Sequence, residues 1–335
     1  MSGADPAGGG SAAGDDAVLP FQLDRLDLRG RLARLDAALN AMLSQHAYPD
    51  SLAGLLGEAA LITALVGQAM KLDGRFSLQA RGDGPVTLLA TDYFAPEAAG
   101  APARLRAYAQ FDPARTPAET DEAFALLGQG VLAMTIDQGA PMKPYQGLTP
   151  LVAGGLAASA ETYFAQSEQI ATRFRLAVAR VSQPGGAERW RAGGVMLQHL
   201  APPGEAAERP AEPTGEDGLM SAADVAEMSD RAEDWGRATL LLDTAEEAEL
   251  IGPVVTPERL LLRLFHEEAP RVFPAAPLSF GCTCSERKLA DVLASYPDEE
   301  LRGLELDGVI QADCQWCGAV YRFTAAELIR RRAAP

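Results

Sequence analysis

Residues 282–287 read Cys-Thr-Cys-Ser-Glu-Arg, and residues 314–317 read Cys-Gln-Trp-Cys. The 4 cysteines of the 335-residue chain all lie in these two short stretches. Four thiolates in two close pairs can close a tetrahedral zinc site with Zn–S bonds of about 2.3 Å, or they can form two local disulfides and release the metal. The predicted zinc ligands are Cys282, Cys284, Cys314 and Cys317. The site is therefore either a structural zinc site or a redox switch.

The length and composition of the chain indicate a globular protein with two or more domains. It is 47% hydrophobic, and we find no uninterrupted apolar run of about 18 residues that would predict a membrane span. Residues 1–20 lack the basic start and apolar core of a secretory signal, so we interpret them as a disordered tail. We expect a cytoplasmic protein with no membrane partner. Paired thiols in a reducing compartment indicate metal or redox chemistry more often than permanent disulfides.

The net charge of −17 is concentrated in two segments. Residues 201–258 contain 15 Asp and Glu against 3 Arg, and residues 1–20 add three more acids. The rest of the chain is close to neutral, so it lacks the basic surface that neutralises phosphates in nucleic-acid-binding proteins. We therefore expect no nucleic-acid partner.

Residues 21–200 are predicted to form one α+β domain. Its first helix is predicted from apolar residues at helical spacing, namely Leu32, Leu35, Leu39, Met42 and Leu43. A second helix is predicted to begin at residues 49–51. Beyond residue 74 the apolar period changes to two, which predicts a β-hairpin over residues 76–90 that turns at 82–84. Further strands are predicted at 105–111, 131–136, 174–181 and 190–197, and a further helix at 161–170.

Three further segments follow the α+β domain. Residues 201–229 are rich in Pro, Glu, Ala and Gly and are interpreted as a flexible acidic insertion. Residues 230–274 are predicted to form a linker of amphipathic helices, which must pack on another surface because short helices are marginal in water. Their predicted apolar faces are Trp235, Ala238, Leu242 and Ala245, and Leu260, Leu261, Leu264 and Phe265. Residues 275–330 are a zinc-binding module too small to hold much core without its metal.

No other motif predicts catalytic chemistry, and we do not expect an enzyme. Residues 128–130 read Gly-Gln-Gly, but they precede a predicted strand and not the helix of a dinucleotide site. Glu58 is interpreted as a polar residue at a helix interface, and His266 is not needed as a ligand beside four thiolates. Trp316 is interpreted as a packing residue over the metal site.

Two other functions fit a four-cysteine site. A zinc ribbon that docks a protein or a nucleic acid predicts a basic surface near the metal, whereas acids outnumber bases in residues 275–330. A thiol–disulfide oxidoreductase that uses Cys314 and Cys317 predicts a helix directly after the motif. Here Gly318 and a β-rich stretch at 320–323 follow the motif instead.

The cysteine pattern resembles that of the 33 kDa heat-shock protein family, also called the 33 kDa chaperonin. Further stretches resemble this family in the same order along the chain, at residues 46–49, 55–58, 79–85, 134–137, 145–147, 163–164, 167–169 and 263–267. The resemblance covers about residues 21–325. The tail at 1–20 and the Pro- and Glu-rich insertion depart from it.

The resemblance implies a redox-regulated, ATP-independent holdase chaperone of the bacterial cytoplasm with three parts. These are a client-binding and dimerisation domain at 21–200, a metastable linker at 230–274 and a zinc redox switch at 275–330. It implies one Zn²⁺ per chain in the reduced form. Oxidation to the disulfides Cys282–Cys284 and Cys314–Cys317 would release the zinc, unfold the switch and the linker, and expose apolar surface. The implied partners are unfolding or aggregating proteins and, when oxidised, a second copy of the chain.

Overall fold

The computed structural model describes residues 15–333 except 71, 121, 183–185, 187 and 200–221. The strands of the main body are β1 (Ala17–Leu23), β2 (Leu28–Leu35), β3 (Arg75–Gly82), β4 (Val86–Phe94), β5 (Ala103–Phe111), β6 (Gly130–Asp137), β7 (Tyr145–Pro150), β8 (Thr172–Ser182), β9 (Glu188–His199), β10 (Arg271–Val272) and β11 (Ala276–Phe280). Among the described residues these strands form one 11-stranded sheet in the order β7-β6-β3-β4-β5-β11-β1-β2-β9-β8, with β10 beside β1. The fold is mixed α+β, as the sequence predicts.

The hairpin predicted from the alternating pattern is formed by β3 and β4. In β3, Phe76, Leu78 and Ala80 alternate toward one face and are fully buried, because successive strand residues point to opposite faces. β3 and β4 pair antiparallel from Arg75 opposite Phe94 to Arg81 opposite Leu88. The strands predicted at 105–111, 131–136, 174–181 and 190–197 are confirmed as β5, β6, β8 and β9.

One long helix fills the inner face of this sheet. After α1 (Ala37–Leu43), helix α2 (Asp50–Ala69) begins directly after Pro49, within the predicted residues 49–51, and is buried on nearly all sides. Its length and composition would suit a membrane span, but 78% of its apolar window is buried inside the protein, as in the core helix of a globular fold. Together with α1 and α3 (Gly155–Tyr163), it forms the larger apolar core against the sheet.

Glu58 is a carboxylate within this core helix. Burial raises the pKa of Glu58 from its ordinary value of 4.5 to about 7. The folded protein thus holds this proton more tightly than the unfolded chain does. Its stabilising contribution is complete below about pH 4.5 and is lost as the pH rises through about 7.

We expect Glu58→Gln to raise the free energy of unfolding at pH 8, because Gln needs no proton to remain neutral. The gain at pH 8 should exceed the gain at pH 4 by about 2–3 kcal/mol. Urea denaturation of both proteins at the two pH values measures the difference. An equal effect of the substitution at both pH values would contradict this account of Glu58.

The helix predicted over Leu32 to Leu43 is wrong in its first half. Leu32 and Leu35 lie in β2, and only Ala37–Leu43 is helical. In a strand, a spacing of three places two residues on opposite faces, and both faces of β2 are covered. Leu35 therefore joins the core around α2, whereas Leu32 joins a second core on the other face of the sheet.

Several predicted boundaries also differ from the structure. β1 begins at Ala17, inside the expected tail, because the Asp16 carboxylate accepts hydrogen bonds from the first N–H groups of α1 and fixes the chain there. The helix expected at 161–170 is instead α3 followed by a π-helical turn, η3 (Phe164–Glu168). The expected insertion overlaps α4 (Ala222–Asp243), and residues 201–221 lie outside the described residues. β11 belongs to the large sheet, although it falls within 275–330.

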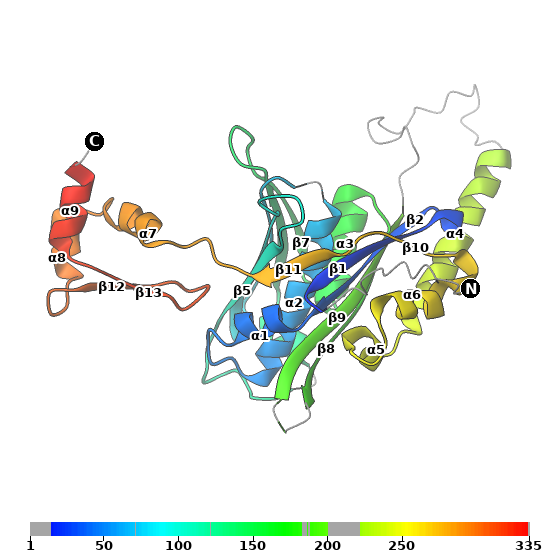
Figure 1. Cartoon of the computed structure of the whole chain (residues 1–335), viewed down its shortest axis with the longest axis horizontal. Helices are drawn as coiled ribbons and strands as arrows, with labels where there is room; N and C mark the ends of the chain where they lie inside the picture. The colour runs from blue at the N-terminus through cyan, green and yellow to red at the C-terminus, as the bar shows by residue number, and fades with distance from the viewer. Residues whose placement is uncertain are drawn as a thin grey trace, which may run out of the picture.

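The linker helices cover the outer face of the sheet (Figure 1). α4, α5 (Glu247–Ile251) and α6 (Pro257–Phe265) pack there on β1, β2 and β9. The predicted apolar faces are confirmed, since Ala238, Leu242, Ala245, Leu260, Leu261, Leu264 and Phe265 are all buried and Trp235 is partly buried against the same core. The Phe265 ring stacks on that of Phe21, with centroids 6.0 Å apart. The buried Arg34 guanidinium also donates to the backbone oxygens of Glu249, Leu250 and Val255, which fixes the end of α5 to β2.

The C-terminal module is small and lies at the opposite end of the molecule from α4–α6 (Figure 1). It contains α7 (Glu286–Leu293), α8 (Asp298–Gly303), β12 (Ile310–Asp313), β13 (Val320–Phe323) and α9 (Ala325–Ala333). Its buried core consists of Ala290, Leu301, Ile310, Phe323, Ala325 and Leu328. So small a core supplies little stability. The turn between β12 and β13 points back toward β5 (Figure 1).

Candidate metal centre

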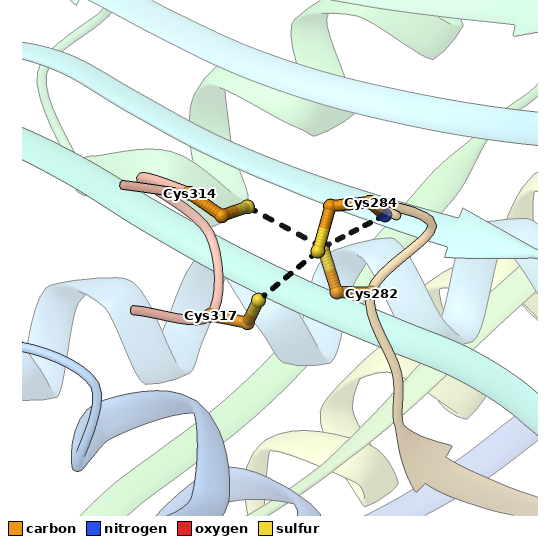
Figure 2. A group of neighbouring side chains, drawn as sticks. All are labelled: Cys282, Cys284, Cys314 and Cys317. Atoms are coloured by element: carbon orange, nitrogen blue, oxygen red, sulfur yellow. Dashed lines mark hydrogen bonds between the residues drawn. The ribbon is translucent and has the colours of Figure 1, made fainter. Parts of the chain in front are cut away.

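The four predicted ligands meet at one point (Figure 2). The Sγ atoms of Cys282, Cys284, Cys314 and Cys317 all lie within 4.8 Å of one another. The Sγ atoms of Cys284 and Cys317 are 3.3 Å apart, and those of Cys282 and Cys314 are 3.7 Å apart. A tetrahedron with Zn–S bonds of about 2.3 Å has S–S edges of about 3.8 Å. The arrangement therefore fits one four-coordinate metal ion, and four soft thiolates favour zinc.

The first pair lies in the extended segment between β11 and α7. The Cys284 N–H donates to Cys282 Sγ at 3.5 Å, which holds the two residues in one local turn. Ser285 then caps α7 by accepting from the Lys288 N–H, and Lys288 Nζ donates to the Thr283 carbonyl at 2.8 Å. The N-terminal cap of α7 thus directly follows Cys284 and fixes the backbone that carries the first cysteine pair.

The second pair lies in the turn that joins β12 and β13. The Cys314 N–H donates to the Ala319 carbonyl, and the Gly318 N–H donates to the Cys314 carbonyl, each at 2.8 Å. Gly318 has a φ of 63°, a left-handed conformation that favours glycine. The turn between two strands holds Cys314 and Cys317 on one side, without the helix N-terminus that an oxidoreductase motif predicts.

The thiols influence one another strongly. Burial acts to raise the pKa of Cys282, but hydrogen bonds from the Cys284 backbone, Arg106 and neighbouring sulfurs outweigh it, and the pKa lies at about 7. Burial raises the pKa of Cys314. Burial first, and then the three neighbouring sulfurs, raise the pKa of Cys317 far above its usual range. Four thiolates this close need a cation to compensate their charge, which is the chemistry a metal ion supplies.

The structure adds two contacts that the sequence did not reveal. Tyr321 Oη lies 3.3 Å from Cys284 Sγ, and this hydrogen bond is the main reason that the pKa of Tyr321 rises to about 12. Arg106 Nη1 donates to Cys282 Sγ at 3.7 Å, although the two residues are 176 positions apart in the chain. No local pattern in β5 marks Arg106 as a neighbour of the cysteines.

The remaining candidate residues lie elsewhere. His266 is in the 3₁₀ turn η4 (His266–Glu268) after α6, and Glu58 is in α2. Residues 128–130 lead into β6, a strand as predicted. Trp316 lies between the ligands Cys314 and Cys317, and its ring contacts Arg106 and Tyr108 of β5, which the sequence did not predict.

Comparison with known proteins places most of the chain in one family. The model of the Hsp33 protein family matches residues 16–324. The 33 kDa chaperonin of Caulobacter vibrioides is 40% identical over 314 residues, which cover 92% of this chain and 94% of that protein. The 33 kDa chaperonin of Ectopseudomonas mendocina is 35% identical over 310 residues, which cover 92% of each chain.

A solved structure shows the same fold. The crystal structure of the 33 kDa chaperonin (heat shock protein 33 homolog) of Thermotoga maritima aligns with a TM-score of 0.72 at 21% sequence identity, covering 95% of this chain and 99% of that one. The sequence resemblance is therefore confirmed by an independent match of fold. Since the family match spans most of the chain and similar proteins are 33 kDa chaperonins, this chain belongs to the Hsp33 family.

Proposed function

We propose that this chain is a redox-regulated, ATP-independent holdase that binds unfolding proteins after oxidation of its four cysteines. The observation that carries the proposal is the convergence of all four Sγ atoms within 4.8 Å. They lie in a module that is joined through β10 and β11 to helices covering an apolar sheet face. We further propose the division into a client-binding and dimerisation domain, a linker and a switch, with boundaries near those of the sequence prediction.

In the reduced protein, Cys282, Cys284, Cys314 and Cys317 would hold one zinc ion. The ion would supply the positive charge that allows four thiolates to lie together. Thiolates react with peroxide more readily than thiols do, so the residues that bind the metal are also those most open to oxidation.

Oxidation by hydrogen peroxide balances as two identical cycles. One thiolate attacks an oxygen of the peroxide, the O–O bond breaks, and a sulfenic acid and a hydroxide ion form. The partner thiolate attacks the sulfenic sulfur, which forms the S–S bond and releases a second hydroxide. Two peroxide molecules thus accept four electrons and produce two disulfides. We propose Cys282–Cys284 and Cys314–Cys317 as the pairs, which the resemblance to the family implies and in which only two or three positions separate the partners.

Loss of the metal should unfold the module. Zinc contributes about 10–16 kcal/mol to the folding of small zinc modules, whereas a whole domain is stable by about 5–15 kcal/mol. The six-residue core of this module leaves little to replace the metal. We therefore expect the fold of residues 282–328 to depend on the reduced, metal-bound centre.

The chain segment between α6 and Cys282 connects the cysteine centre to the linker helices. After α6, β10 pairs with β1 at Phe21 opposite Val272, and β11 pairs with both β1 and β5 before the chain reaches Cys282. An unfolded module would leave the linker held only by these short pairings and by the packing of α4–α6 on the sheet. Release of α4–α6 would uncover the outer sheet face, including Phe21, Val195 and Leu197, as apolar surface for clients.

The partners and location follow from this function. The clients would be unfolding or aggregating proteins, and the oxidised chain would form a homodimer in the cytoplasm. The acidity of residues 201–258 would keep client complexes soluble by charge repulsion. The excess of acids around the centre argues against binding nucleic acid.

Light scattering from an unrelated, thermally unfolding protein tests this function. We expect suppression of aggregation by the peroxide-treated chain, and little by the reduced, zinc-loaded chain. Oxidised protein that is reduced again and given zinc serves as the control and should lose the activity. Equal suppression by oxidised and reduced protein would contradict a redox switch.

A further inference from the structure

The cysteine module touches the main body through the turn that carries its second cysteine pair. Trp316 lies in this turn, and the guanidinium carbon of Arg106 is 3.9 Å from its ring centroid. The Tyr108 ring lies 6.2 Å from the same ring. His46 Nε2 donates to the Gln315 carbonyl at 2.6 Å. Three side chains of the body, those of His46, Arg106 and Tyr108, therefore contact two adjacent residues of the metal-binding turn, Gln315 and Trp316.

On the body side, Arg106 ends a buried polar row that crosses three strands. Ser77 lies opposite Asp92, and Asp92 lies opposite Arg106, in register across β3, β4 and β5. The Ser77 hydroxyl donates to one Asp92 oxygen, and Arg106 Nε donates to the other at 2.7 Å. Only 2% of Asp92 and 8% of Arg106 is exposed. These hydrogen bonds hold the Arg106 guanidinium in place independently of the C-terminal module.

The remaining edge and face of the guanidinium contact both halves of the cysteine centre. Nη1 donates to Cys282 Sγ at 3.7 Å and to Thr283 Oγ1 at 3.4 Å, which belong to the first pair. The flat face receives Trp316 from the second pair. Planar arginine suits this double contact, because one edge can bind a carboxylate while the face stacks on an aromatic ring.

We propose that Arg106 is the docking residue by which the α+β body holds the cysteine centre, and that this docking is coupled to metal binding. The proposal rests on the ligand set of the proposed function. Without a metal the two halves are separate chain segments, each with a weak contact to Arg106. With a metal they form one unit that engages Arg106 at two points, so the second contact becomes intramolecular and gains effective concentration.

Coupling of this kind is reciprocal. If the metal promotes docking, docking must strengthen metal binding by the same factor. A desolvated cation–π contact of this geometry implies a factor of about 10. Undocking would also uncover the rings of His46 and Tyr108, which contact the turn and whose centroids are 5.4 Å apart. Loss of the metal would thus expose this part of the body even before the linker helices move.

Zinc affinity of the reduced full-length chain tests the coupling, measured by competition with a chromogenic chelator. We expect Arg106→Lys, which keeps a charge near Asp92, to weaken zinc binding about tenfold. Trp316→Leu, which leaves the Arg106–Asp92 pair intact, should weaken it by a similar factor. The double variant should bind zinc no more weakly than Arg106→Lys alone, because Trp316→Leu removes a contact that Arg106→Lys has already removed. Arg75→Lys is the matched control, since Arg75 also lies near Asp92, at 3.9 Å, but on β3.

A second readout reports docking itself. In protein labelled with 5-fluorotryptophan, the ¹⁹F resonance of Trp316 is the one absent from Trp316→Leu. We expect this resonance to shift when a chelator removes zinc without oxidant, and to be shifted already in zinc-loaded Arg106→Lys. An unmoved resonance, or unchanged zinc affinity in either variant, would overturn the coupling while the proposed function stands. A reduced wild-type chain that binds no zinc would instead overturn the proposed function.

Discussion

Replacing Cys314 and Cys317 together by Ser should leave a chain that no longer binds stoichiometric zinc and no longer responds to peroxide. Two of the four sulfurs that lie within 4.8 Å are then missing, and two thiolates do not complete a tetrahedral zinc site. Because zinc contributes about 10–16 kcal/mol to such modules, residues 282–328 should be unfolded in the variant even when it is reduced. Zinc analysis and limited proteolysis measure the two effects.

The control for this variant is Ser295→Ala, which removes an exposed hydroxyl from the same module. Ser295 Oγ donates only to the nearby Val292 carbonyl, so this change should leave both zinc content and the peroxide response as in the wild type. A double-serine chain that bound zinc and changed its client binding with peroxide as the wild type does would contradict the assignment of the ligands.

Phe265→Ala should release the linker helices without any oxidation. Phe265 is fully buried between α6 and β1, where it stacks on Phe21. Removing a buried Phe side chain costs about 3–5 kcal/mol, which increases the open population of a local unit roughly 100-fold or more. We expect faster hydrogen exchange over residues 231–265 and suppression of client aggregation by the reduced, zinc-loaded variant.

Leu262→Ala provides the matched control on the same helix. Leu262 is 58% exposed, so its truncation removes little buried surface and should leave hydrogen exchange of the linker unchanged. If Phe265→Ala opened the linker but left the reduced chain inactive, the sheet face under α4–α6 would not be the surface that binds clients.

The sequence alone was sufficient to predict an element wherever the buried residues of that element recur with the period of one strand face or one helix face. The β3–β4 hairpin alternates with period two, and the linker helices repeat apolar residues at helical spacing. The metal site could be predicted equally well, because a four-thiolate site depends on residue type and short spacing, which a sequence displays directly. These signals need no knowledge of distant partners.

Features that depend on two covered faces or on distant contacts were not predictable. Leu32 and Leu35 belong to two different cores, so their spacing imitates a helix. β11 joins the large sheet through pairing with β5, which no local pattern in residues 276–280 records. Arg106 meets Cys282 only because β5 and β11 are neighbours in the sheet. Such contacts arise from topology, and a single sequence carries no direct trace of them.

The most direct test of the account follows zinc release, thiol content and client binding in one peroxide titration of the reduced, zinc-loaded chain. We predict that one zinc ion per chain is freed as four thiols are lost, and that suppression of client aggregation rises in parallel with the zinc released. Full loss of thiols and zinc with no gain in client binding, or client binding that rises while zinc stays bound, would contradict the account.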